Sequence, residues 1–186
     1  MIRGIIVGVV LTLVVFAVGA YFGVERGLMP ANADSPPSSL ERWAAKTSLH
    51  ATIDRDAPKT PNPVPLDDAN LIAGIKLYGA NCIVCHGAAD GAPSNVARGL
   101  YQHAPQLAKD GVEDDPDGET YWKVAHGIRL TGMPAFGPTL QERQLWELAL
   151  FLKHMDHLSP AANRVWKSLK NPASLAPARP DQNVPG

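Results

Sequence analysis

The sequence predicts an all-α protein that carries one N-terminal transmembrane helix. Three observations support this fold class. A long uncharged apolar run opens the chain, apolar residues recur at helical spacing in three later segments, and no segment shows the alternating pattern of a strand. A length of 186 residues suits one modest domain with flanking segments. The formal net charge of -1 gives no electrostatic support for a nucleic-acid partner.

Residues 1–25 are predicted to be a transmembrane anchor. Residues 4–24 carry no charge, and Arg3 precedes them. About 20 apolar residues suffice to span a bilayer, and a basic N-terminal flank places the rest of the chain on the periplasmic or extracytoplasmic side of the cell membrane. The alternative is a cleaved signal peptide, because "ANA" at 31–33 resembles a processing site. The apolar run is longer than a usual signal core, which favours the anchor.

Residues 26–66 are predicted to be a Pro/Ser-rich spacer. "ADSPPSS" and "DAPKTPNPVP" contain prolines that interrupt helices and sheets. Between them, residues 39–53 have the composition of a short helix that opens at Ser38 or Ser39 and carries Leu40 and Trp43. We interpret this helix as part of the linker, with contact to the membrane surface or to a partner as the alternatives.

Residues 67–158 are predicted to form the folded domain, which begins with a helix. Asp67 or Asp68 supplies its N-cap, and the helix leads directly into "NCIVCHG" at 81–87. Residues 87–117 are rich in Gly, Ala, Pro and Asp, so they are expected to be largely irregular.

Two further helices are predicted in this domain. The first covers about two turns of "DGETYWKVAHG", with Asp117 as its cap and Gly127 as its stop. The second covers residues 139–158, where Thr139 and Glu142 stand at capping-box spacing. Its apolar stripe is formed by Leu145, Leu148, Leu152 and Met155, with Phe151 beside it.

The only two cysteines of the chain, Cys82 and Cys85, are followed directly by His86. A disulfide would close a very short loop and leave the histidine without a role. A thioredoxin-like pair requires alternating strands and helices, and a zinc site requires two further ligands. Covalent haem attachment uses all three residues, because the thiols add to the haem vinyl groups and the histidine reaches the iron. The motif therefore predicts one covalently bound haem c.

Met133 is the candidate for the second iron ligand. It lies in "GIRLTGMPAFGP", where Pro134 favours an extended backbone and Gly132 allows close approach to a flat surface. The alternative is that Met133 only fills a gap in a turn. Histidines that could replace it are His103, His126, His154 and His157, whereas His50 lies in the spacer.

With these two motifs, residues 68–157 resemble the class I c-type cytochromes, particularly bacterial single-haem modules with "CHG" near the start and a "TGMPAF" loop before the last helix. The resemblance implies a small class I cytochrome c fold in which Cys82 and Cys85 hold the haem, with His86 as proximal and Met133 as distal iron ligand. It also implies that the carbonyl of Pro105 orients the proximal histidine.

Other positions also match the pattern of this family. Gly74 and Tyr78 correspond to the place where the first helix crosses the last, near Leu145 and Phe151. Trp122 and Gly127 fit the short helix before the methionine loop, and Phe136 of that loop joins the residues implied to contact the haem.

The resemblance implies a single-electron carrier or an electron-transfer subunit, not an enzyme, in a respiratory or related membrane redox chain. Its expected partners are redox proteins such as a membrane dehydrogenase, an oxidase or a quinol-oxidising complex. The competing class is a haem enzyme or gas sensor with a displaceable sixth ligand.

The charge pattern departs from the lysine-rich face of mitochondrial members of this family. Between 67 and 156 there are twelve acidic and seven basic residues, and six of the carboxylates lie between Asp110 and Glu119. This acidic run is a candidate docking surface for a basic partner. Residues 159–186 are predicted to be a basic, Pro-rich tail with one helical turn from Arg164 to Leu169.

Overall fold

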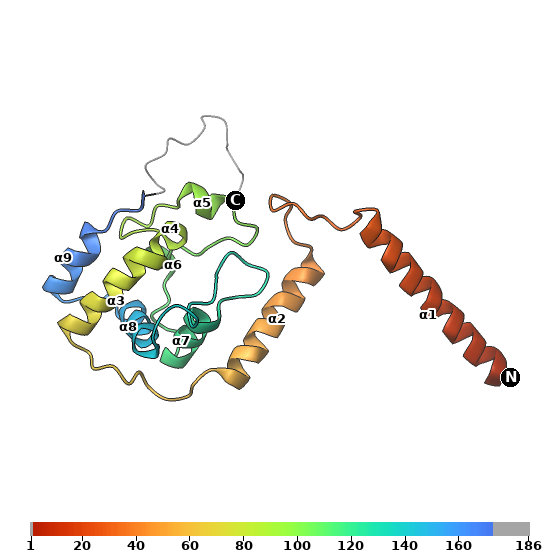
Figure 1. The fold of residues 1–186 in the computed structure, drawn as a ribbon, viewed down its shortest axis with the longest axis horizontal. Helices are drawn as coiled ribbons and strands as arrows, with labels where there is room; N and C mark the ends of the chain where they lie inside the picture. Colours follow the sequence, from red (N-terminus) through yellow and green to blue (C-terminus); the bar gives the residue numbers. More distant parts are fainter. Residues whose placement is uncertain (1, 173–186) are drawn as a thin grey trace. The chain divides into compact units, whose positions relative to one another are not determined.

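The computed structural model describes residues 2–172, and these residues form helices and loops without a strand, as Figure 1 shows. The predicted all-α fold is confirmed. The chain divides after Pro36 into two compact units, which are described separately here.

The first unit contains α1 (Ile2–Glu25), a helix of 24 residues with no buried residue. It is long and apolar enough to cross a membrane, and a signal sequence near an N-terminus has the same properties. An apolar helix without protein packing exposes its hydrophobic side chains, so its stable environment is lipid rather than water.

The second unit begins with α2 (Ser39–Asp56), which Ser38 caps by accepting a hydrogen bond from the Glu41 N–H at 3.2 Å. Its last turn and the following residues pack against the rest of this unit. Ile53 and Ala57 are buried, and the side chain of Asn62 donates to the Trp146 carbonyl at 2.9 Å. The second half of the expected spacer is therefore part of the folded unit. Prolines exclude helix and sheet there, but they allow an extended segment with satisfied polar groups.

The centre of the fold is the crossing of α3 (Asp68–Asn81) and α8 (Glu142–Lys153). A Cβ atom at Gly74 would overlap the Glu147 carbonyl oxygen and lie 2.9 Å from Cβ of Phe151. Glycine therefore lets the two helix backbones approach closely. Next to this contact, the ring of Tyr78 meets Phe151 edge-on with centroids 5.5 Å apart. The crossing implied at Gly74, Tyr78 and Phe151 is present.

A third helix, α7 (Asp117–His126), packs on α8 through stacked rings of Tyr121 and Trp146, 4.1 Å apart. Gly127 ends it at φ 65, as predicted. The prediction that Asp117 caps the helix is wrong. Pro116 occupies the N-cap position, and the Asp117 carboxylate accepts from the Asn62 backbone N–H at 2.9 Å.

The predicted capping box of α8 is also wrong. Gln141 is the N-cap residue, and Gln144 completes the capping box. A glutamine side chain both donates and accepts, so it satisfies the first helical N–H groups as Thr and Glu would. The Thr139 hydroxyl instead donates to the Phe136 carbonyl. The four predicted stripe residues are all buried: Leu145, Leu148, Leu152 and Met155.

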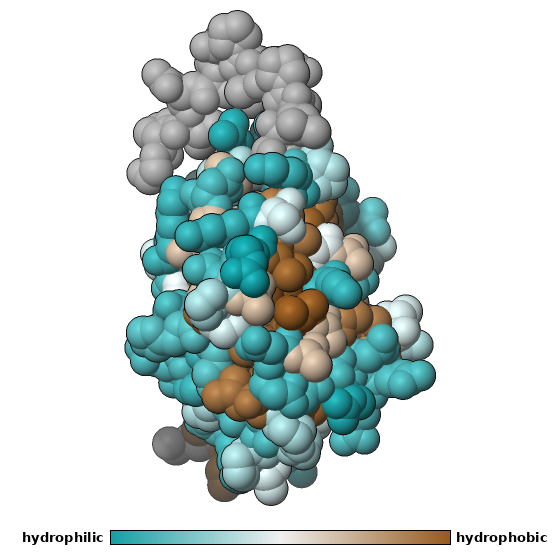
Figure 2. All heavy atoms as spheres, turned by 90° about the vertical axis from the view of Figure 1, so that its left-hand side faces the viewer, coloured by the Kyte–Doolittle hydropathy of each residue, from teal (hydrophilic) through white to brown (hydrophobic). Residues whose placement is uncertain are grey.

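Three single-turn helices connect these elements: α4 (Ile83–His86), α5 (Asn95–Arg98) and α6 (Leu107–Asp110). After α8, the structure has α9 (Pro160–Ser168) where a tail with one turn was expected. Ser159 caps α9, and Ala162 and Trp166 are buried. The face that carries α9 is mostly hydrophilic with a central strip of hydrophobic residues (Figure 2). The rest of the predicted basic tail, residues 173–186, lies outside the described residues.

Candidate functional site

The two cysteines and the adjacent histidine lie in one tight turn, residues 82–87, which we call the thiol turn. It directly continues α3, because the Cys82 N–H donates to the Tyr78 carbonyl at 2.8 Å. The N–H groups of Cys85 and His86 both donate to the Cys82 carbonyl, at 3.1 and 3.0 Å. Both cysteines are free thiols, so the disulfide alternative is not realised in this structure.

The ring of His86 is oriented by the backbone of Pro105. Its Nδ1 lies 2.9 Å from the Pro105 carbonyl oxygen. A carbonyl oxygen only accepts, so Nδ1 carries the hydrogen and Nε2 carries the free lone pair. Burial lowers the pKa of His86, while the bond to Pro105 opposes that shift. The neutral imidazole therefore presents Nε2 as a ligand atom, and the contact implied for Pro105 is present.

The backbone of the thiol turn is fixed by side-chain donors from four separate places in the chain. Each donor bonds a different carbonyl: Tyr78 bonds Gly87, Ser94 bonds Val84, Gln106 bonds Cys85, and Asn171 bonds Ile83. No motif in the sequence indicates the last three donors. Ser94 and Gln106 occupy the N-cap positions of α5 and α6, but no spacing rule connects a cap to a distant carbonyl.

The thiols are protonated and lack the neighbours of a metal centre. Burial, helped by the nearby Cys85, raises the pKa of Cys82 to about 12, and burial also raises the pKa of Cys85. Within residues 2–172, no three His, Cys, Asp or Glu side chains lie close enough to hold a metal ion. A zinc site would therefore lack its further ligands there. Two neutral thiols beside an oriented imidazole fit covalent haem attachment.

Met133 lies in residues 128–137, the Met133 loop, which folds back onto the end of α7. The Phe136 and Gly137 N–H groups donate to the Val124 and Ala125 carbonyls at 3.1 and 2.9 Å. Met133 is partly buried and packs against the hydrophobic core. Its N–H donates to the Thr131 hydroxyl at 3.1 Å.

Two glycines allow the Met133 loop to pack closely. A Cβ atom at Gly127 would lie 2.6 Å from the Pro134 carbonyl carbon and 2.7 Å from the Met133 oxygen. A Cβ atom at Gly132 would lie 2.5 Å from Cδ2 of Leu100, so this loop contacts the segment that leads to Pro105.

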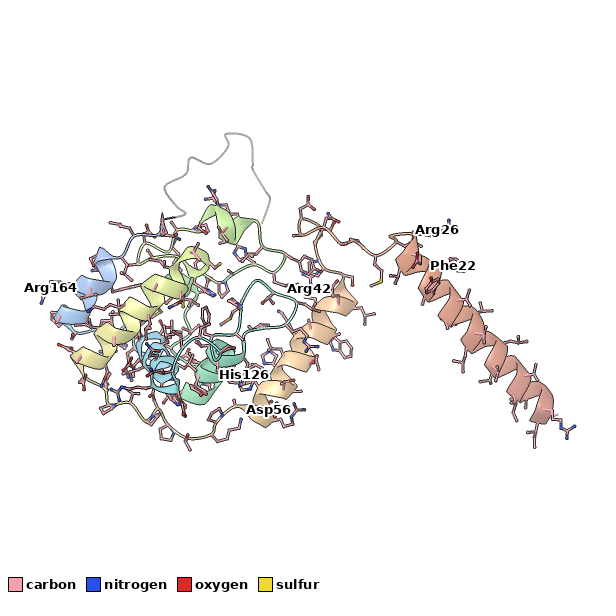
Figure 3. The ribbon with its side chains drawn as sticks, viewed as in Figure 1. Phe22, Arg26, Arg42, Asp56, His126 and Arg164 are labelled. Carbon is pink, nitrogen blue, oxygen red and sulfur yellow. The ribbon has the colours of Figure 1, made fainter. Side chains whose placement is uncertain are left out.

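The remaining candidates lie at different places around the domain. Phe136 packs against the core beside Met133, whereas the Trp122 ring lies 5.0 Å from the His126 ring. Figure 3 shows His126 on α7 close to Asp56 at the end of α2, and this proximity contributes to lowering the pKa of Asp56 after the larger effect of Arg55. Besides His126, the other rival histidines are His103 and His157, which are exposed, and His154, which bonds the Leu150 carbonyl; His50 of the spacer is also exposed.

Most carboxylates of the acidic run have partners inside the protein. The Asp115 and Glu119 carboxylates pair with Lys123 at 2.8 and 2.7 Å. Backbone N–H groups bond three others: Asp110 from Gln106, Glu113 from Val112, and Asp117 from Asn62. Asp114 is exposed. These contacts show that the run stabilises its own loop, which weakens its candidacy as a docking surface.

One hollow on the surface of the described residues lies away from the thiol turn. It has a volume of about 560 Å³ between α7 and residues 135–142, and its polar lining comes from Tyr121, His126 and Glu142. Ala135 and Gly137 of the Met133 loop line it, whereas no thiol-turn residue does. The geometry of donors, rather than a cavity, therefore defines the candidate site.

Comparison with protein families gives a match over residues 69–152 to the family described as cytochrome C oxidase, cbb3-type, subunit III. No curated protein and no solved structure matches the chain. The matched region contains the thiol turn, Pro105 and the Met133 loop, and it ends before α9. Residues 69–152 are therefore a cytochrome c domain, similar over this region to the cbb3-type oxidase subunit III family.

Proposed function

We propose that this chain is a single-electron carrier, or an electron-transfer subunit of an oxidase, with one haem c held by Cys82 and Cys85 and ligated by His86 and Met133. The observation that carries the proposal is the hydrogen bond from His86 Nδ1 to the Pro105 carbonyl at 2.9 Å, within a turn that also presents both thiols. When bound, the haem supplies an iron that gains and loses one electron.

The protein residues have distinct parts in this proposal. Cys82 and Cys85 fix the haem covalently, so it stays bound whatever the state of the sixth ligand. The Pro105 carbonyl keeps Nε2 of His86 as the free nitrogen and makes the imidazole a more basic ligand. The hydrogen-bonded carbonyls of the thiol turn keep this side chain in place, so little protein rearrangement accompanies electron transfer.

Met133 is proposed as the sixth ligand because its loop is supported on both sides. Backbone bonds join the loop to the end of α7, and Gly127 and Gly132 leave room for close contacts. A thioether ligand favours the reduced state and raises the reduction potential. This ligand set would suit an electron carrier better than an enzyme, because His86 and Met133 would together leave the iron no position for a substrate.

The membrane and partner assignments follow from α1 and from the family. We propose that residues 1–25 remain as an anchor, that the haem domain lies on the periplasmic side, and that an oxidase is its redox partner. The support is the length and composition of α1 and a family description that names an oxidase subunit. An intact protein released from membranes by detergent but not by carbonate supports the anchor. A soluble protein that begins at Asp34 shows a cleaved signal instead.

The test of the central proposal is Met133→Ala, with Met155→Leu as the control. Met155 is buried two residues after the end of α8 and outside the Met133 loop, so its replacement also removes a buried thioether but not the proposed ligand. The wild type is expected to be low-spin with the weak far-red band of sulfur ligation. The Ala variant is expected to keep covalent haem, become high-spin and show a lower reduction potential.

Other results would redirect the assignment. A native spectrum in Met133→Ala would exclude Met133 as the ligand and make His103 or His126 the next residues to test. A wild-type spectrum that is high-spin and shifts with low concentrations of cyanide or carbon monoxide would favour a haem enzyme or gas sensor. Absence of covalent haem in the wild type would contradict the whole proposal.

A further inference from the structure

Residues 160–171 lie outside the region that matches the cytochrome family, yet they pack tightly on its first helix. Trp166 is 5 % exposed, and its ring centroid lies 5.2 Å from Tyr78 and 5.1 Å from Phe151. Since Tyr78 and Phe151 also contact each other, the three rings form a buried aromatic triad across α3, α8 and α9. Arg164 points away from this packing, as Figure 3 shows.

The aromatic triad connects directly to the thiol turn. The Tyr78 hydroxyl, in the middle of the triad, donates to the Gly87 carbonyl at 2.8 Å, one residue after His86. Burial raises the pKa of Tyr78, so its hydroxyl remains a donor. Leu169 continues the packing, because a Cβ atom at Gly79 would lie 3.0 Å from its Cδ2 atom.

Asn171 completes the contact from the other end. Its Nδ2 donates to the Ile83 carbonyl at 2.8 Å, and Asn171 is only 4 % exposed. The same carbonyl accepts the Gly87 N–H at 3.0 Å. The Ile83 oxygen therefore accepts both from Asn171 of the C-terminal segment and from the Gly87 N–H that closes the thiol turn. When a buried carbonyl loses such a donor, no water molecule replaces the lost hydrogen bond.

We propose that residues 160–171 form a brace that positions the thiol turn, with Asn171 as the positioning residue. The brace acts at both ends of the turn: Asn171 holds the Ile83 carbonyl, and Trp166 holds the Tyr78 ring whose hydroxyl bonds Gly87. His86 lies between these two points, so the brace maintains its bond to Pro105. The effect on an iron ligand rests on the proposed function, whereas the effect on the turn does not.

The test compares Asn171→Leu with Ser168→Ala in the full-length protein. Leucine has the same number and branching of side-chain heavy atoms as asparagine but cannot donate, and Ser168 is an exposed residue whose hydroxyl bonds Val165 within α9. We expect hydrogen exchange at the Gly87 amide to become about tenfold faster in Asn171→Leu, with Val124 and Ala125 in α7 unchanged. Ser168→Ala is expected to leave hydrogen exchange unchanged both at Gly87 and in α7.

A second readout separates positioning from simple stabilisation. A looser turn weakens the His86–Pro105 bond and makes the imidazole a less basic ligand, so the reduction potential of Asn171→Leu is expected to rise. The potential of Ser168→Ala is expected to stay at the wild-type value. If leucine prevents folding, Asn171→Ala removes the same donor with a smaller side chain and undergoes the same measurements.

Two results would overturn the brace. Unchanged exchange at Gly87 would show that Asn171 does not hold the turn, and equal acceleration at Gly87 and in α7 would show a global loss of stability. The exchange comparison is read on backbone amides of the folded protein and uses no property of the haem. A wild type without covalent haem would therefore refute the proposed function while the amides still decide whether the brace exists.

Discussion

The thiol turn and the Met133 loop carry the two proposed iron ligands, but the fold holds these two regions in different ways. Side chains from distant parts of the sequence bond the carbonyls of the thiol turn, and the most distant, Asn171, is 88 residues from its acceptor. The Met133 loop is held mainly by backbone bonds to the helix that it follows and by its own Thr131. The turn depends on the completed fold, whereas the loop depends on local structure.

This difference indicates that the turn is the more rigid side of the site. Opening the thiol turn requires several long-range contacts to break together, whereas the Met133 loop can open locally. The loop also contains Leu130 at φ 60 with 81 % of its surface exposed, a conformation that costs a non-glycine residue about 1 kcal/mol. Mutations in the Met133 loop should therefore disturb the proposed Met133 ligand without removing the covalently attached haem.

The largest effect is expected from Gly74→Ala, which breaks the crossing on which the thiol turn rests. The new Cβ atom would overlap the Glu147 carbonyl and press on Phe151. We expect the free energy of unfolding to fall by about 3 kcal/mol or more in denaturant titrations. Gly99→Ala is the matched control, since a Cβ atom there meets its neighbours at 3.7 Å. Equal stability of the two variants would show that α3 and α8 do not meet at Gly74.

A smaller and local effect is expected from Gly127→Ala. Position 127 has φ 65, and the new Cβ atom would press on the Met133 and Pro134 backbone. We expect a loss of about 2 kcal/mol, together with a displaced Met133 loop. Absorption spectra should show covalent haem with weakened sulfur ligation. A native far-red band would mean that the loop tolerates this displacement. The Met133 loop would then hold its side of the site as firmly as the thiol turn does.

The same contrast explains which features were predictable from sequence. Covalent chemistry fixes the spacing of Cys82, Cys85 and His86, so the motif could be recognised without a fold. The cap at Asp67 and the buried stripe of α8 follow local rules. Asn171 could not be found, because an asparagine that bonds a carbonyl 88 residues away leaves no periodic pattern. The helix before Asn171, α9, was predicted only as one turn, because the prolines of residues 159–186 favour irregular structure, although Pro160 fits the first turn of a helix.

A pair of hydroxyl deletions compares the two regions directly. Tyr78→Phe removes the donor from α3 to the Gly87 carbonyl, and Thr131→Val removes the acceptor of the Met133 N–H within the loop. We expect Tyr78→Phe to lower the free energy of unfolding by about 1 kcal/mol. Thr131→Val should change it by less than about 0.5 kcal/mol while accelerating exchange in the loop. The reverse order would show that the Met133 loop, not the thiol turn, is coupled to the global fold.

The acidic run requires variants that separate docking from internal pairing. Burial lowers the pKa of Lys123, but its hydrogen bonds to Asp115 and Glu119 outweigh burial, so the pKa is raised overall. A lysine with a raised pKa stabilises the fold at neutral pH, and this contribution is lost as the pH rises above about 10.5. Asp115→Asn should therefore lower stability at pH 7 by up to about 1 kcal/mol and reduce the loss at high pH.

The smallest effect is expected from Asp114→Asn, which tests docking alone. Asp114 is exposed, so its replacement should leave unfolding unchanged and remove one charge from the surface. If a basic partner docks there, second-order electron transfer at low ionic strength should slow by less than about twofold, and the difference should vanish near 0.5 M salt, where screening acts within a few ångströms. An unchanged rate at low salt would assign the run to loop stability. Docking would then be sought at the exposed Leu130 and its neighbours in the Met133 loop.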